Sequence, residues 1–230
     1  LESNPIMLNK SLLDPMELSS FSDDLEGDKI DEFQAIEGAR DIITSKTRAC
    51  VNLVKELTDV GKTVIVWCIF IKTIRTLTEL LEKEGIPVCN VYGETVDRQE
   101  TIDGFKAGKY QVLITNPQTL AESVSLHKVC HDAVYFEYSY NLVQMLQSKD
   151  RIHRLGLANY QYTQYHFLET VFSDEMQMIS LDEEIHRRLN DKEKVMLDAI
   201  ENDSLEHFTT NDKEIEDIML KIGFDKENFK

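Results

Sequence analysis

The sequence is poor in cysteine and proline and contains no long apolar run. Its 4 cysteines are widely spaced and form no C-x-x-C pair, so we expect reduced thiols and neither a disulfide scaffold nor a zinc framework. No apolar run approaches the roughly 20 residues that a bilayer span requires, and no basic start followed by an apolar stretch opens the chain. We therefore expect no membrane contact, and a cytoplasmic protein, or a nuclear one if the source is a eukaryote. Leu1 in place of Met indicates a piece of a longer polypeptide.

Basic residues are also scarce. The chain has 25 Lys and Arg against 42 Asp and Glu, so its formal net charge is 25 − 42 = −17, which argues against a wholly basic nucleic-acid wrapper. The acids gather at both ends: residues 1–45 carry 11 acids and 3 bases, and residues 181–230 carry 15 acids and 8 bases. The middle, residues 46–180, has 16 acids and 14 bases. This nearly neutral block can still present a local basic face to phosphate groups.

Apolar runs and amphipathic stretches alternate through the central block. The run at 64–70 is continuous and rich in β-branched and aromatic residues, as a strand buried on both faces of a parallel sheet requires. Further strands are expected at 88–92, 111–115, 133–137 and 160–168. Helices are expected at 45–60, around 74–81, at 95–107, near Leu120 and at 141–153. This order predicts an α/β fold, a parallel sheet with helices on both faces.

The two flanks differ from the central block. Residues 1–44 scatter apolar side chains among acids and serines, which indicates an irregular or helical acidic connector. Beyond residue 172, apolar residues such as Ile185 and Leu189 recur at helical spacing, and a last short helix is expected at 215–222. We therefore divide the chain into a connector at 1–44, a central lobe at 45–172 and a helical C-terminal extension at 173–230.

Two short motifs suggest a function that their context does not support. Gly61-Lys62-Thr63 looks like the end of a phosphate loop, but it lies between a helix and a strand, whereas a phosphate loop runs from a strand into a helix. We interpret it as a solvent turn. His127, Cys130 and His131 offer three metal ligands within five residues, but no second cluster completes a four-ligand site. We expect no metal bound by side chains.

The most informative segment is Gln147-Ser148-Lys149-Asp150-Arg151-Ile152-His153-Arg154-Leu155-Gly156. If the segment is helical, Gln147, Arg151 and Arg154 share one face, because they lie four and three residues apart. Clustered guanidinium groups suit an anion with several oxygens, above all a phosphoryl group in transfer. The alternative is a surface helix with solvated charges.

The order of the segments gives this block a specific resemblance. It is similar to motif VI of superfamily-2 helicases, Q-x-x-x-R-x-x-R, and in the longer form Q-x-x-D-R-x-H-R-x-G it resembles the Swi/Snf-type branch of double-stranded DNA translocases. Upstream, residues 64–70 look like motif IV, residues 112–115 with 121–126 occupy the place of motif V, and residues 135–141 resemble the stretch D-x-x-W-N. The resemblance covers residues 45–168. Ala121-Glu122-Ser123 replaces the family's glycine-rich motif V, and Tyr140 replaces its tryptophan, which favours a bacterial or viral subgroup.

The resemblance implies the second RecA-like lobe of an ATP-dependent enzyme. In this family ATP and Mg²⁺ are held mainly by a first lobe, which would be the N-terminal RecA-like lobe of the same parent chain. Arg151 and Arg154 would be the arginine fingers, and Gln147, Asp150 and Gly156 would bind ATP or couple the lobes. Because the 230 residues contain no phosphate loop and no D-E-x-[HD] acids, we expect this chain alone to be inactive.

The resemblance also implies a nucleic-acid track. It would contact the phosphates of double-stranded DNA without reading sequence, as expected for contacts to the backbone alone. Its residues would be Thr115, Asn116, Ser123, Ser125 and Asn141.

Two other functions stay open. The first is a catalytically inactive, acidic partner-binding module that retains the RecA-like fold, which the charge of −17 favours. The second is an unrelated doubly wound nucleotide-binding protein, which would need a glycine-rich strand-to-helix turn.

Overall fold

The computed structural model describes residues 43–120, 124–153, 162–173 and 178–202, so the expectations for 1–42 and 215–222 lie outside the described residues. Within them, five strands form one sheet in the order β2-β3-β1-β4-β5, and every neighbouring pair is parallel. The strands are β1 (Val64–Trp67), β2 (Val88–Val91), β3 (Val112–Thr115), β4 (Asp132–Tyr135) and β5 (Gln164–Phe167). The predicted α/β fold with a parallel sheet is confirmed.

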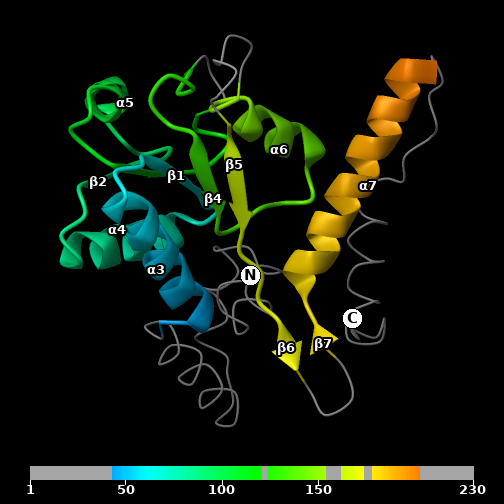
Figure 1. Cartoon of the computed structure of the whole chain (residues 1–230), viewed down its shortest axis with the longest axis horizontal. Coiled ribbons are helices and arrows are strands. Elements are labelled where there is room, and N and C mark those ends of the chain that lie inside the picture. Colours follow the sequence, from blue (N-terminus) through cyan, green and yellow to red (C-terminus); the bar gives the residue numbers. More distant parts are fainter. Residues whose placement is uncertain (1–42, 121–123, 154–161, 174–177, 203–230) are drawn as a thin grey trace, which may run out of the picture.

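Helices cover both faces of this sheet (Figure 1). They are α3 (Ser45–Asp59), α4 (Ile71–Lys83), α5 (Arg98–Lys106), α6 (Leu142–Lys149) and α7 (Leu181–Asn202). Alternate residues of a strand point to opposite faces, so Val64 and Val66 pack with α3 and α4, while Ile65 and Trp67 pack with α5, α6 and the first half of α7. Strand β1 lies at the centre and is fully buried on both faces, as its continuous apolar run predicts.

The turn at Gly61 is the one predicted between a helix and a strand. Thr44 caps the start of α3, because its hydroxyl accepts a hydrogen bond from the Thr47 amide at 3.2 Å. Gly61 then adopts a φ of +79° directly after the helix, a conformation that glycine reaches without steric cost. The solvent turn predicted for Gly61-Lys62-Thr63 is therefore confirmed.

Several predicted elements differ in extent or in type, and three of them show the cause. Strand β1 ends at Trp67 instead of residue 70. The Glu137 carboxylate accepts hydrogen bonds from the amides of Ile69 and Phe70, so the chain turns into α4 at this point. The helix predicted at 141–153 ends at Lys149. A turn at 117–120 occupies the place of the helix expected near Leu120, because the side-chain oxygen of Asn116 accepts the Thr119 amide at 2.8 Å and closes a local turn.

The C-terminal extension does not begin as a helix. A short strand, β6 (Phe172–Ser173), first pairs antiparallel with β7 (Met178–Ile179). Helix α7 follows, and the Ser180 hydroxyl accepts the Glu183 amide at 3.1 Å at its start. The expectation of helix from residue 173 onward was therefore wrong for this hairpin and right for α7.

The cysteines are free and buried. Burial raises the pKa of the Cys50 thiol to about 12, so this thiol stays protonated and inert at neutral pH. In the described part of the chain, no helix is long and apolar enough to cross a membrane.

Candidate functional site

The carboxyl edge of the sheet brings together the ends of three strands that carry sequence motifs. Trp67 is in register with Thr115 on one side and with Tyr135 on the other, so β1, β3 and β4 end side by side. Ligands of open parallel sheets bind at this edge, in the crevice beyond the strand ends. The loops at 68–70, 116–120 and 136–141 therefore form one candidate surface.

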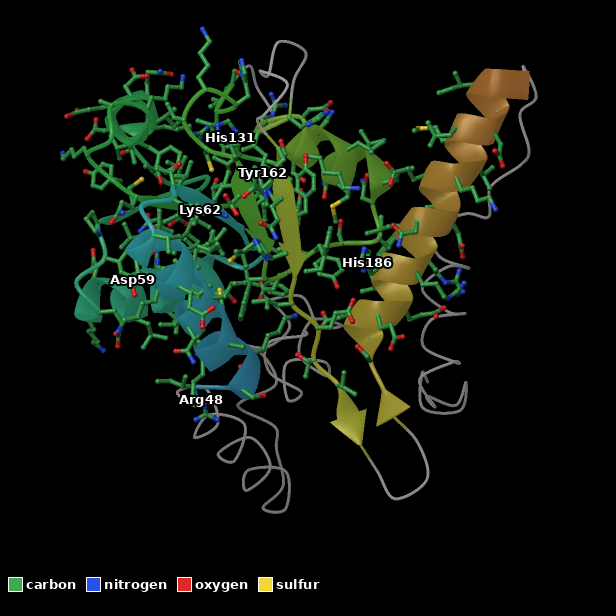
Figure 2. All side chains as sticks on the ribbon, viewed as in Figure 1. Arg48, Asp59, Lys62, His131, Tyr162 and His186 are labelled. Atoms are coloured by element: carbon green, nitrogen blue, oxygen red, sulfur yellow. The ribbon has the colours of Figure 1, made fainter. Side chains whose placement is uncertain are left out.

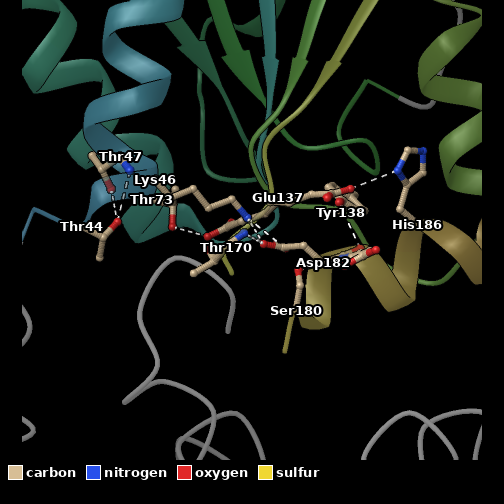
Figure 3. Close-up of polar contacts among 12 residues, drawn as sticks. Thr44, Lys46, Thr47, Thr73, Glu137, Tyr138, Thr170, Ser180, Asp182 and His186 are labelled. Atoms are coloured by element: carbon tan, nitrogen blue, oxygen red, sulfur yellow. Dashed lines mark hydrogen bonds and ion pairs between the residues drawn. The ribbon is translucent and has the colours of Figure 1, made fainter. Parts of the chain in front are cut away.

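Glu137 closes the strand-to-helix turn after β1. Its carboxylate accepts the amides of Ile69 at 2.9 Å and Phe70 at 3.0 Å. It also accepts the Thr73 hydroxyl at 2.7 Å (Figure 3). The side chain is 1% exposed. The start of a helix attracts anions through its amides and its dipole. A carboxylate of the protein itself fills this position, so the turn is not built to receive a phosphate group.

A buried ion pair lies beside Glu137 and joins the two ends of the described chain. Lys46 of α3 donates to both carboxylate oxygens of Asp182 of α7, at 3.0 and 2.9 Å (Figure 3). Asp182 also accepts the Thr170 amide, and the Lys46 ammonium lies 5.4 Å from the centre of the Phe136 ring. Breaking such a pair on one side leaves an uncompensated buried charge, so the pair fixes α7 against α3.

Arg151 lies just beyond the end of α6. Asn141 caps the start of this helix by accepting the Gln144 amide at 3.2 Å, and Asp150 is its C-cap. The Arg151 side chain is buried, and its guanidinium donates to the Val124 carbonyl at 3.4 Å. The Arg151 carbonyl in turn accepts the Leu126 amide at 2.8 Å. Arg151 thus ties α6 to the loop that follows β3.

The predicted arginine face is only partly described. Gln147 is exposed on α6, and Asp150 is exposed at its end. Because α6 ends at Lys149, Arg151 does not continue the helical face of Gln147, so the expectation of a shared helical face was wrong for this pair. Arg154 and Gly156 lie outside the described residues.

The predicted nucleic-acid residues differ in accessibility. Thr115 is fully buried, Asn116 is partly exposed and Asn141 is exposed. The hydroxyl of Ser125 lies 2.6 Å from Nδ1 of His127. Ser123 lies outside the described residues.

An apolar pocket of about 220 Å³ opens between α7 and the carboxyl edge of the sheet. Its wall includes Ile69, Tyr138, Tyr140 and Ile185. Sequence reasoning missed this pocket, as well as Glu137 and the Lys46–Asp182 pair. A signal existed only for Glu137, an acid placed directly after an apolar strand.

The end of α6 is also held by two tyrosines. Tyr135 of β4 shares a hydrogen bond of 2.7 Å with the Ser148 hydroxyl, and Tyr165 of β5 donates to the Lys149 carbonyl at 3.3 Å. Burial raises the pKa of Tyr135 well above its ordinary value and that of Tyr165 to about 12. Both phenols therefore stay protonated and able to donate at neutral pH.

Comparison with known proteins finds similarity in the central segment of the chain. Residues 45–156 match the helicase conserved C-terminal domain. The structure of the C-terminal part of the Fun30 ATPase domain is similar, with a TM-score of 0.53 and 23% identity over 64% of this chain and 45% of that chain. Dbp5 of S. cerevisiae, bound to RNA and ADP BeF3, is similar with a TM-score of 0.50 and 19% identity, over 64% of this chain and 35% of that chain.

These likenesses confirm the RecA-like fold, and residues 45–156 are similar to the helicase conserved C-terminal domain. The chain spans less than half the length of either solved structure. No curated protein matches the chain. Among the described residues, no group of three or more His, Cys, Asp or Glu side chains is arranged to hold a metal ion.

Proposed function

We propose that this chain is the second lobe of an ATP-dependent DNA translocase or helicase of the Swi/Snf-type branch. The observation that carries the proposal is the position of Arg151. It follows the end of α6 and is bonded through side chain and backbone to the loop at 124–126. In this proposal, the segment with Arg151 and Arg154 serves both the nucleotide and the DNA.

In this proposal the first lobe holds ATP and Mg²⁺, and this lobe supplies guanidinium groups to the phosphates of the ATP. Glu137 already fills the strand-to-helix turn after β1, so this turn does not hold the phosphates of ATP. Arginine suits the task because its planar guanidinium spreads two hydrogen bonds over phosphoryl oxygens and stays charged. Such a finger contributes about 10³ to 10⁵ in rate in other nucleotide hydrolases.

We assign different tasks to the two arginines. Arg151 is buried and bonded to Val124, so its proposed task is to couple the loop after β3 to the end of α6. Arg154 takes the contact with the γ-phosphate. Gln147, Asp150 and Gly156 remain proposed lobe-coupling residues.

The proposed DNA track uses amides and hydroxyls. The side-chain oxygens of Asn116 and Asn141 accept local backbone amides, which leaves their NH₂ groups to donate to phosphate. Ser123 and Ser125 would add hydroxyl donors, whereas buried Thr115 would act only through its backbone. Such contacts grip DNA without reading its sequence. The protein would work wherever its DNA lies, in the cytoplasm of a bacterium or the nucleus of a eukaryote.

The test is ATP hydrolysis by this chain alone and by the chain joined to the coding sequence upstream of it. Each protein is assayed with duplex DNA and with single-stranded RNA. We expect activity only in the joined protein, stimulated by duplex DNA. Arg154→Ala should then lower turnover about 10³-fold without loss of helical circular dichroism. The matched control is Arg48→Ala, because Arg48 is exposed on α3 (Figure 2). Near-parental turnover of Arg154→Ala would contradict the finger assignment.

The second candidate is an inactive partner-binding module. The burial of Arg151 favours it, because an arginine that is 8% exposed and whose guanidinium is bonded to Val124 is less available to a nucleotide. Silence of the joined protein with both nucleic acids would support this module.

A further inference from the structure

Helix α7 holds α6 at both of its ends. The Lys192 ammonium donates to the Tyr140 carbonyl at 3.1 Å and lies 5.6 Å from the centre of the Tyr140 ring, one residue before the cap of α6. The next residue, Glu193, accepts from Lys149 at 3.4 Å, and Lys149 is the last residue of α6. Two adjacent residues of α7 therefore contact the start and the end of one helix.

The first half of α7 is anchored independently of these contacts. Asp182 forms the buried pair with Lys46, and its carbonyl accepts the Tyr138 hydroxyl at 3.2 Å. Ile185 and Leu189 belong to the same buried cluster as Met145 and Ile152, which lie in and just after α6. The next turns of α7 thus have a fixed base from which Lys192 and Glu193 reach α6.

The backbone that carries Arg151 depends on the residues that α7 holds. The Ile152 and His153 amides both donate to the Lys149 carbonyl, at 3.2 and 3.0 Å. The carbonyl of Lys149 therefore accepts hydrogen bonds from the residues that follow Arg151, while its side chain pairs with Glu193. A shift of α7 would be transmitted through Lys149 to the segment beyond it.

We propose that α7 is a positioning element for the arginine segment, with Lys192 and Glu193 as positioning residues. This inference rests on the proposed function for its effect on ATP hydrolysis, but the structural coupling stands without it. Docked α7 keeps the end of α6 in place, and release of α7 disengages the segment and slows hydrolysis. The C-terminal helix then regulates the proposed ATPase.

The first measurement uses the 230-residue chain itself and needs no activity. Hydrogen exchange is followed at the amides of residues 150–153 in Glu193→Gln, Lys149→Gln, their double variant, and Lys192→Met/Glu193→Gln. A partly exposed ion pair is worth a modest amount, so each single variant should speed exchange there about two- to fivefold. The double variant of the pair should be no worse than either single variant, because one interaction is lost in all three. The exposed Asp198 provides the control, Asp198→Asn.

The second measurement uses the chain joined to its upstream lobe. Glu193→Gln should lower kcat about three- to tenfold and leave the KM for ATP unchanged, because small misplacement of a catalytic group affects the transition state. A purely structural role would instead reduce the folded fraction and lower activity at unchanged kcat per folded molecule. Unchanged exchange at residues 150–153, or faster exchange with unchanged kcat, would overturn the positioning role. If the joined protein hydrolyses no ATP, the proposed function fails, and the exchange data still decide the coupling.

Discussion

The two edges of the sheet use charged residues in different ways. At the carboxyl edge Glu137, Lys46 and Asp182 are at most 4% exposed and bond to the starts of α4 and α7. At the amino edge Lys62 pairs with Asp132 at 2.9 Å while 29% of its side chain stays exposed, with Tyr162 close by (Figure 2). Solvent and salt weaken an exposed pair much more than a buried one. Charge at the carboxyl edge therefore fixes how helices meet, whereas the pair at the amino edge joins a partly exposed lysine of a turn to the buried start of β4.

Loss of a charge should lower the stability of the fold more at the carboxyl edge than at the amino edge. Asp182→Asn leaves the Lys46 ammonium buried without a carboxylate, so we expect the free energy of unfolding to fall by about 3–5 kcal/mol. Guanidinium denaturation followed by circular dichroism measures this loss. Hydrogen exchange should show α7 opening before the sheet does.

A double variant separates the pair from its surroundings. In Lys46→Met/Asp182→Leu both charges are replaced by apolar side chains of similar size, which often recovers the stability lost by a single change. A double variant no more stable than Asp182→Asn would contradict the view that an uncompensated charge causes the loss.

Glu137→Gln should have the next largest effect. Gln keeps one acceptor oxygen but loses the negative charge at the start of α4, and hydrogen bonds to a charged group contribute about 1.5–3 kcal/mol. We expect a loss of stability in that range, measured by the same denaturation. The matched control is Glu94→Gln, because Glu94 forms an exposed pair with Arg75. Equal losses in both variants would remove the distinction between buried and exposed carboxylates.

The sequence predicts the sheet well because its strands are buried on both faces. Such strands must be continuously apolar, and the apolar run that begins at Val64 is typical of them. Its end was misplaced by three residues because Ile69 and Phe70 are as apolar as the strand, and only the distant Glu137 decides that their amides start a helix. Local composition does not encode that contact across 68 positions.

The candidate site is predicted less fully, for a related reason. Motif spacing locates the arginine segment, and the structure places Arg151 at the end of α6. Spacing on an ideal helix could not predict that the helix ends at Lys149, since its end is set by Tyr165 and by the Leu126 amide. The pairing of Lys46 with Asp182 joins residues 136 positions apart and has no sequence signal at all.

Lys62→Met tests the amino edge and should have the smallest effect. The hydrogen bond to Asp132 raises the pKa of Lys62, so the pair stabilises the fold in full below the unfolded-state value of about 10.4 and is lost as pH rises through the folded-state value. Lys62 is partly exposed, and the Asp132 carboxylate that it leaves behind keeps His166 at 3.6 Å, so we expect a loss of about 1 kcal/mol at pH 7, smaller than that of Asp182→Asn. The difference between the variant and the parent should shrink above about pH 10. Denaturation at pH 7 and at higher pH measures both effects, and a loss as large as that of Asp182→Asn would show that the two edges are equally dependent on charge.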